Sequence, residues 1–274
     1  MTTNTPARRR MALTAAAAVA VAALGAACTD DGAAQRSRPP AVQGTERPPA
    51  GQTDERGTDD PFVLRGATVM RTPTTSVRED LYVADGVLVE PTRDEHTVVD
   101  ASGTYAVPLT VESAVSRRPV SQRNIHDLVP GNRATFALVR RPVSEVQVRT
   151  MLVIDPADLA AVYVSGHLEA LDGRPTRPAG ADLTDPAAAQ TWVGTWVDPA
   201  RDVEQHLLAD GRYSETRSGR ADAYTGRYWV RDDRITYLDD SGFWAFGELL
   251  DGTLHHAGLV MNRPDLSLGS AEPG

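Results

Sequence analysis

The chain has 274 residues, 41% of them hydrophobic but only 5% aromatic, and its 37 acidic residues outnumber 28 basic ones. The formal net charge of −9 argues against nucleic acid as a partner, because phosphate binding requires a basic surface. The 22 glycines and 19 prolines favour short strands and linkers over long helices.

The N-terminus has the three parts of an export signal. Arg8 to Arg10 form a positive region, Met11 to Leu24 an apolar run of 14 residues, and Gly25 to Ala27 a small-residue cleavage site before Cys28. A run of this length is too short to span a bilayer, which takes about 20 residues. The arrangement resembles a bacterial lipoprotein signal, which implies removal of residues 1–27 and acylation of Cys28, the only cysteine of the chain. The n-region does not decide between general secretion and twin-arginine export.

Residues 28–60 are predicted to be a disordered tether. They are rich in Pro, Gly, Thr and charged residues and contain no aromatic residue, so they cannot bury enough apolar surface to offset the entropy of ordering. Without residues 1–27 the chain keeps 25 arginines against 37 acidic residues, a net charge of −12. We therefore expect an exported protein held on the outer face of the cell membrane by a lipid anchor.

From residue 61 to 170 the sequence consists of short β-branched runs interrupted by glycine. Such runs are typical of strands, and Ala84-Asp85-Gly86 between two alternating runs predicts a tight hairpin. We expect strands throughout this region, including residues 144–155, and no convincing helix. The expected fold of the region is a small β-sandwich.

The stretch VVDASGTYAVP, which ends at Pro108, resembles the lead-in of the amidohydrolase superfamily. The resemblance implies that residues 61–170 form the composite β-sandwich of that family. Its metal-ligand positions fall here on Ala114 and Ser116, neither of which can hold a metal. A catalytic (β/α)₈ barrel takes about 250 residues, whereas Thr110 to Leu128 offers 19. The resemblance therefore implies a sandwich without its catalytic barrel.

The histidines of this region also argue against metal-dependent hydrolysis. His96, His126 and His167 are isolated, there is no His-x-His pair, and the chain contains no lysine that could be carbamylated. We expect the three histidines at the surface or in turns. No catalytic residue, metal or cofactor is predicted.

Residues 171–190 are rich in Pro, Ala, Asp and Thr and are predicted to be a linker, and residues 265–274 a tail. The segment 191–264 between them is different, because Trp192 to Phe246 hold ten of the fifteen aromatic residues. Asp210-Gly211 and Asp251-Gly252 predict hairpin turns between seven or eight short strands. Such a meander favours closure into a small antiparallel up-and-down barrel, with a β-sandwich as the alternative. The expected fold class of the whole chain is all-β.

The segments LLADGRYSETR, AYTGRYWV and ITYLDDSGFWAFGELLDGTLHHAGLVMNR are similar to a small bacterial family of unknown function, first recognised in Agrobacterium. This resemblance implies a streptavidin-like barrel with a ligand-binding interior and no established activity. Gly194 and Trp196 also resemble the Gly-x-Trp that opens lipocalin-type barrels, which implies a structural role for both.

Strand alternation predicts which side chains face the barrel interior. Tyr213, Glu215 and Arg217 share a face, and we predict it to point inward because the opposite face of this strand has no large apolar group. An inward Glu215 and Arg217 should bond each other, a tyrosine, water or a ligand. The predicted ligand-binding set is Tyr213, Glu215, Arg217, Tyr228, Tyr237 and His256.

These observations leave two kinds of function open. The first is a non-catalytic, lipid-anchored protein whose barrel binds a small, unidentified ligand. The second is a protein–protein interaction scaffold of the cell envelope, with a barrel that is packed solid. Catalysis is disfavoured because Asp239-Asp240 and His255-His256 are adjacent on strands, so the members of each pair point to opposite faces.

Overall fold

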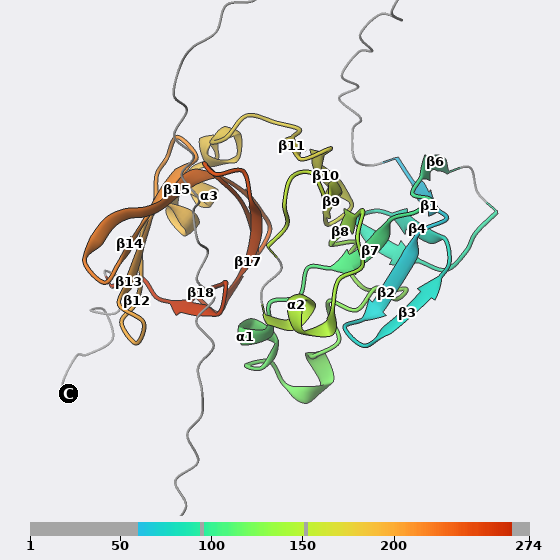
Figure 1. The fold of residues 1–274 in the computed structure, drawn as a ribbon, viewed down its shortest axis with the longest axis horizontal. Coiled ribbons are helices and arrows are strands. Elements are labelled where there is room, and N and C mark those ends of the chain that lie inside the picture. The colour runs from blue at the N-terminus through green and yellow to red at the C-terminus, as the bar shows by residue number, and fades with distance from the viewer. Residues whose placement is uncertain (1–59, 94–95, 151–152, 265–274) are drawn as a thin grey trace, which may run out of the picture. The chain divides into compact units, whose positions relative to one another are not determined.

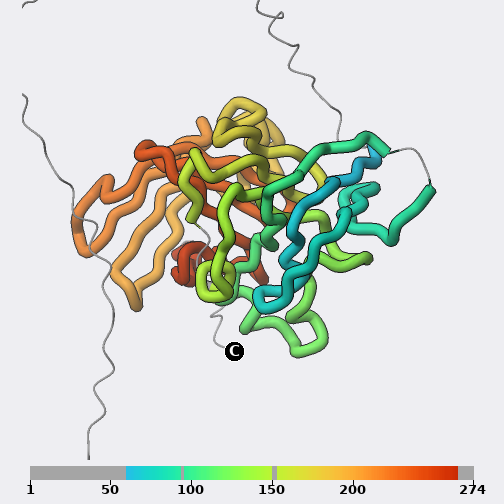
Figure 2. Tube along the Cα trace, turned by 45° about the vertical axis from the view of Figure 1, so that its right-hand side comes forward, coloured from blue at the N-terminus to red at the C-terminus, as the bar shows by residue number. Residues whose placement is uncertain are grey.

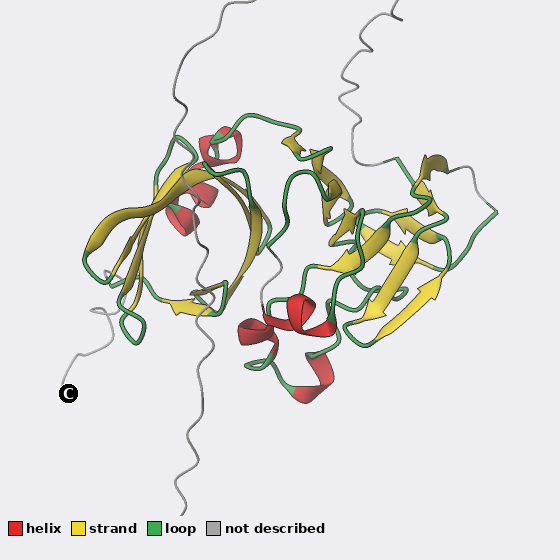
Figure 3. Ribbon diagram, in the orientation of Figure 1, coloured by secondary structure: helices red, strands yellow, loops and turns green. Residues whose placement is uncertain are grey.

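The computed structural model describes residues 60–93, 96–150 and 153–264. Cys28, the predicted signal peptide, the tether before residue 60 and the predicted tail lie outside the described residues. The expected all-β fold is confirmed: strands dominate, and the described helices are short (Figure 3).

The N-terminal β-domain, residues 60–175, is built from two sheets (Figure 1). The first sheet has the order β5 (Val87–Val89), β4 (Leu81–Ala84), β1 (Phe62–Arg65) and β6 (Thr97–Asp100). The second has the order β11 (Arg174–Pro175), β10 (His167–Leu171), β9 (Leu159–Val164), β8 (Phe136–Val139), β7 (Tyr105–Pro108), β2 (Thr68–Thr72) and β3 (Thr75–Arg78). Asp85 and Gly86 both have positive φ and form the predicted two-residue turn between β4 and β5.

The central strands of the second sheet are buried on both faces. In β8, Phe136 and Leu138 belong to a core shared with the first sheet, whereas Ala137 and Val139 belong to a core shared with the barrel. Strands with two buried faces read as continuous apolar runs, and all four residues of β8 are buried.

Three short helices lie among these strands: α1 (Glu112–Val115), η1 (Val120–Gln122) and α2 (Glu145–Thr150). The expectation of a strand across residues 144–155 was wrong, because α2 occupies part of it. The Ser144 hydroxyl accepts a hydrogen bond from the Gln147 backbone N–H, and the Gln147 side chain accepts one from the Ser144 N–H. This reciprocal Ser-x-x-Gln capping box starts a helix.

The barrel consists of eight antiparallel strands in sequence order, which Figure 2 follows as the tube passes from orange to red. They are β12 (Gly194–Asp198), β13 (Val203–Leu207), β14 (Arg212–Arg217), β15 (Arg220–Arg231), β16 (Arg234–Asp239), β17 (Trp244–Leu250), β18 (Thr253–His256) and β19 (Leu259–Met261). Val197 and Asn262 exchange two backbone hydrogen bonds of 2.9 Å, which join the first strand to the end of the last. The predicted up-and-down barrel is therefore confirmed.

The segment predicted as a linker contains η2 (Ala181–Thr184) and α3 (Pro186–Trp192). Asp185 caps α3 by accepting a 3.1 Å hydrogen bond from the Ala187 N–H, and Pro186 fits the first turn, where its missing N–H costs nothing. Trp192 ends the helix inside the barrel core.

Candidate functional site

The interior of the barrel contains a buried carboxylate, that of Glu215 on β14. Tyr213 and Glu215 are both buried, at 6% and 2% exposure, and Tyr213 belongs to the apolar core of the barrel. Arg217 follows on the same face beside the β14–β15 turn, and its side chain is 41% exposed. The face of β14 that strand alternation predicted to point inward does so at Tyr213 and Glu215, whereas the third side chain of this face, Arg217, reaches solvent.

Glu215 is held by two side chains. Arg217 Nε donates a hydrogen bond to one carboxylate oxygen, and Gln205 Nε2 donates one of 3.3 Å to the other. Gln205 in turn accepts a 2.7 Å hydrogen bond from the Tyr237 hydroxyl. These bonds form a polar chain from the exposed guanidinium to a fully buried tyrosine, as required for polar groups in an apolar interior.

Aromatic rings surround this polar chain. The Tyr237 ring lies 4.3 Å from the His256 ring and 5.2 Å from the Tyr213 ring, the second pair in an edge-to-face arrangement. Tyr228 is buried in the same core, but its hydroxyl donates to the Leu208 carbonyl at 2.8 Å, away from Glu215. Glu215 and four of the other five predicted residues therefore lie together, in contact directly or through an intervening side chain. The hydroxyl of the sixth residue, Tyr228, points elsewhere.

Burial sets the protonation of these groups. It raises the pKa of Tyr213 and of Tyr237 well above the usual value, and nearby carboxylates reinforce the shift. It lowers the pKa of His256, against the opposing effect of the hydrogen bond that the Phe246 carbonyl accepts from His256 Nδ1. At neutral pH the interior therefore presents neutral phenols and a neutral imidazole around Glu215.

Gln205 and Asp239 also belong to this site, although neither is in the predicted ligand-binding set. Asp239 accepts a 3.3 Å hydrogen bond from the Tyr213 hydroxyl. Gln205 shares its face with Val203 and Leu207, both buried in the barrel core, so the alternation on β13 carried the signal for an inward polar residue.

One end of the barrel is closed by Trp196 and α3. Trp196 is fully buried, its indole N–H donates to the Trp192 carbonyl at 3.0 Å, and the Arg263 guanidinium lies 5.8 Å from its ring. Gly194 has a φ of +139° and lies against the Arg263 side chain. These contacts fit the structural role expected of Gly194 and Trp196.

A second buried carboxylate, that of Glu248 on β17, lies on the outer wall of the barrel. Arg118 donates a hydrogen bond to Glu248, Arg234 donates one of 3.0 Å, and His126 Nε2 lies 2.9 Å from Glu248 Oε2. Arg234 also donates to the Leu109 carbonyl of the N-terminal β-domain. We call Arg118, His126, Arg234 and Glu248 the interdomain charge cluster.

Burial and mutual contacts shift the pKa values of residues in the interdomain charge cluster. Burial would raise the pKa of Glu248, but the hydrogen bonds from His126 and Arg118 and the charge of Arg234 outweigh it and lower the pKa to about 2. Burial lowers the pKa of His126, which is therefore neutral at neutral pH. His126 lies in a turn, one of the two placements expected for it, and its side chain is only 11% exposed because the barrel covers it.

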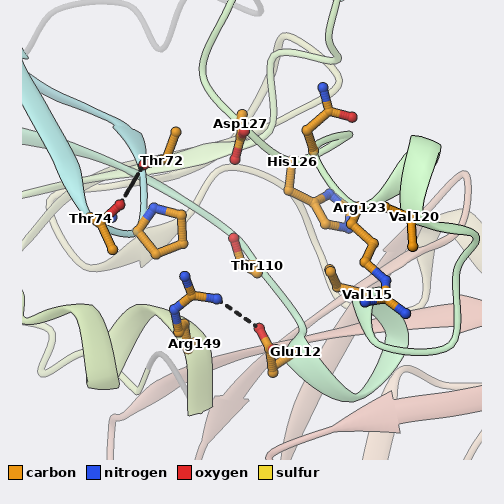
Figure 4. A pocket seen from close by; sticks show the side chains of 12 residues that line it. Thr72, Thr74, Thr110, Glu112, Val115, Val120, Arg123, His126, Asp127 and Arg149 are labelled. Atoms are coloured by element: carbon orange, nitrogen blue, oxygen red, sulfur yellow. Dashed lines mark hydrogen bonds and ion pairs between the residues drawn. The ribbon is translucent and has the colours of Figure 1, made fainter.

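A polar cleft of about 280 Å³ opens next to His126 in the N-terminal β-domain (Figure 4). Side chains from β2, α1, α2 and the segment after η1 line it, with Thr72, Thr110, Glu112, His126, Asp127 and Arg149 among them. Burial raises the pKa of Asp127, opposed by His126 and Arg149.

The positions matched to amidohydrolase metal ligands lie outside this cleft lining. Ala114 is fully buried in α1 and Ser116 is exposed just after it. The part of the chain that the structure describes contains no group of three or more His, Cys, Asp or Glu residues placed to hold a metal. Likewise, no helix among residues 60–93, 96–150 and 153–264 is long and apolar enough to cross a membrane.

The fold of residues 194–262 defines a class, the small antiparallel up-and-down barrel with one end closed by a helix and a tryptophan. Residues 189–263 match the family model described as Agrobacterium tumefaciens protein Atu4866. This segment is therefore an Atu4866-like barrel domain, and its function is unknown. The solution structure of the protein Atu4866 from Agrobacterium tumefaciens is 44% identical over 27% of this chain and 94% of that chain, with a TM-score of 0.25. No curated protein matches the chain.

The match to the family model begins at residue 189. The resemblance of residues 61–170 to the amidohydrolase β-sandwich and of residues 1–27 to a lipoprotein signal stay predictions.

Proposed function

We propose that this protein is a non-catalytic, lipid-anchored protein of the outer face of the cell membrane, and that its barrel binds a small polar ligand at Glu215. The N-terminal signal, Cys28 and the polar tether support the anchor. The barrel supplies the binding site, and the N-terminal β-domain is the body against which the barrel packs.

The observation that carries the proposal is the pairing of Glu215 with Arg217. Glu215 is buried, yet its charged partner is 41% exposed and stacks 4.6 Å from the ring of Tyr224, which is itself half-exposed. A ligand with N–H donors arriving from solvent can take over the carboxylate as the arginine side chain swings outward. Tyr213, Tyr237 and His256 then supply the apolar walls that small-molecule sites use.

A ligand screen on the full chain tests this proposal. We expect compounds that raise the melting temperature of the wild-type protein to lose this effect in Glu215→Gln, because that change removes the charge and keeps the shape. Glu204→Gln is the matched control, since Glu204 lies on the neighbouring strand, faces outward and is half-exposed. Compounds that stabilise Glu215→Gln as strongly as the wild type would place the site elsewhere.

The contacts between the rings favour a second candidate, an interaction scaffold with a solid barrel. In that case partners would dock on the outside, where Tyr224 and Phe243 are 47% and 42% exposed. Replacing both with serine would then abolish partner capture, and Glu215→Gln would leave partner capture unchanged. The reverse result, loss of ligand binding in Glu215→Gln alone, favours the first proposal.

A further inference from the structure

The outer wall of the barrel carries a row of buried polar residues that the N-terminal β-domain covers. Arg234, Glu248 and His255 are direct neighbours across β16, β17 and β18. The helix α1 packs against β17 and β18 (Figure 1). Ser113 Oγ of α1 lies 3.1 Å from His255 Nδ1, and Arg118, just after α1, donates a hydrogen bond to Glu248. Arg118 and His255 therefore flank the same carboxylate.

The charges of the buried row do not balance. Arg118 and Arg234 share one carboxylate, that of Glu248, and their side chains are only 12% and 4% exposed. His255 brings no negative charge, because burial lowers the pKa of its imidazole and leaves the ring neutral at neutral pH. Arg117 adds a further positive charge near His255. An excess of positive charge shielded from water is costly unless an anion offsets it.

The acidic residues closest to the row have arginine partners of their own. Asp233 accepts a hydrogen bond of 2.9 Å from Arg133, and Glu112 lies 3.6 Å from Arg149. All four of these side chains are at least a third exposed, so solvent also screens them. They leave the excess charge of the enclosed row in place.

Two nitrogen atoms beside Glu248 have no hydrogen-bond partner. Arg118 uses an Nη atom for Glu248, and its Nε is enclosed without a hydrogen bond. His255 is completely buried, and its Nε2 is likewise enclosed without one. The Ser113 hydroxyl can donate to Nδ1 of His255, which leaves the proton of the neutral ring on Nε2. Two N–H donors then lie next to the excess positive charge without an acceptor.

We propose that a chloride ion binds between Arg118 Nε and His255 Nε2, where the N-terminal β-domain meets the barrel. A chloride ion supplies one negative charge, so that two arginines face two anions. It accepts hydrogen bonds from any direction and is small enough to be enclosed, whereas a carboxylate or phosphate group needs more donors than these two nitrogens provide. This site is separate from Glu215 in the barrel and does not depend on the function proposed for it.

Melting temperatures of the full chain test the proposal when sodium gluconate is replaced stepwise by sodium chloride. The ionic strength stays at about 0.5 M, so the screening of exposed charges does not change. We expect chloride to raise the melting temperature by about 2–4 °C, the shift that an excess of about fivefold over the dissociation constant gives for a chain of this size. A crystal soaked in bromide should show an anomalous scattering peak in contact with Arg118 Nε and His255 Nε2.

Three variants should change the chloride effect in different directions. Arg118→Gln leaves one arginine for one carboxylate and should abolish the shift, and His255→Leu removes a donor and should reduce it. Glu248→Gln increases the excess of positive charge, so it should enlarge the shift although it destabilises the protein. The control is Arg220→Gln, at an exposed position of β15, which should keep the wild-type shift.

The wild-type measurements decide the proposal even if a variant fails to fold. Equal melting temperatures in chloride and gluconate would overturn it, because only general screening would then remain. An ordered water molecule in place of the bromide peak would also overturn it, since water can satisfy both nitrogens without adding charge. A shift that Arg118→Gln and Arg220→Gln reduce equally would place the bound anion elsewhere and overturn it as well.

Discussion

Arg118 donates a hydrogen bond to Glu248 across 130 residues of sequence, and the pair joins the N-terminal β-domain to the outer wall of the barrel. Both partners are almost completely enclosed, at 12% and 0% exposure. Arg234 shares the same carboxylate from the barrel side, so one negative charge serves two guanidinium groups. The interdomain charge cluster therefore depends on Glu248 more than on any other of its members.

Glu248→Gln should lower the free energy of unfolding by about 3–5 kcal/mol, because it leaves two buried arginines without a counter-charge. Chemical denaturation monitored by tryptophan fluorescence measures this change, since Trp244 lies on the same strand. Glu204→Gln, an exposed carboxylate of the same barrel, should change the stability by less than about 0.5 kcal/mol. Equal free energies of unfolding for the two variants would show that the interdomain charge cluster does not stabilise the fold.

The stability of the protein should fall as the pH drops below about 6.5. Burial is the main cause that lowers the pKa of His126, His255 and His256, so the unfolded chain takes up protons before the folded protein does. Stability is then fully present above the unfolded pKa and declines below it, by up to about 1.4 kcal/mol per pH unit for each histidine. Glu248 adds a second loss between about pH 4.5 and 2.

Melting temperatures recorded from pH 8 to pH 5 test this dependence. His126→Gln and His255→Gln should each flatten the curve, because glutamine does not titrate. His206→Gln is the control, since His206 lies in the same barrel and its side chain is a third exposed. A melting temperature that rises on acidification would contradict the prediction.

Gly226→Ala should destabilise the barrel by about 1–3 kcal/mol, the usual cost of forcing extra atoms into a packed site. A Cβ at Gly226 would lie 2.4 Å from the Leu238 carbonyl oxygen and 2.7 Å from the Tyr213 ring. Backbone cannot yield as a flexible side chain does, so Tyr213 and β16 must both shift. The neighbouring exposed residue provides the control Arg227→Ala, and thermal unfolding monitored by circular dichroism compares the two.

Cys28→Ala should move the protein out of the membrane fraction or block its processing, because acylation requires the thiol. Fractionation of cells, followed by mass determination of the N-terminus, measures both effects. A variant that is processed and sediments with membranes as the wild type does would remove the lipid anchor from the proposed function.

The barrel could be predicted well from the sequence because strand alternation and hairpin turns depend on residues that are close together in the chain. Alternation placed Tyr213 and Glu215 inward, and the Asp251-Gly252 turn came from two adjacent residues whose positive φ values suit a two-residue hairpin. The helix α2 also had a local signal, the pair Ser144 and Gln147, but the β-branched residues around it suggested a strand.

The interdomain charge cluster could not be predicted in this way. Arg118, His126, Arg234 and Glu248 are brought together only by the docking of the barrel on the second sheet, and no spacing in the sequence records that docking. The cleft has the same origin, since Thr72, Asp127 and Arg149 meet through tertiary contacts alone.

The stacked indoles of Trp229 and Trp244, with centroids 5.7 Å apart, have a consequence for how the chain is divided. Both face away from the barrel interior and into a core that includes Val107 and Leu159 of the second sheet. A barrel excised at residue 189 would expose these two indoles to water. We expect such a fragment to self-associate, because association would bury the indoles again. We therefore expect the full chain to unfold in one cooperative calorimetric transition rather than two.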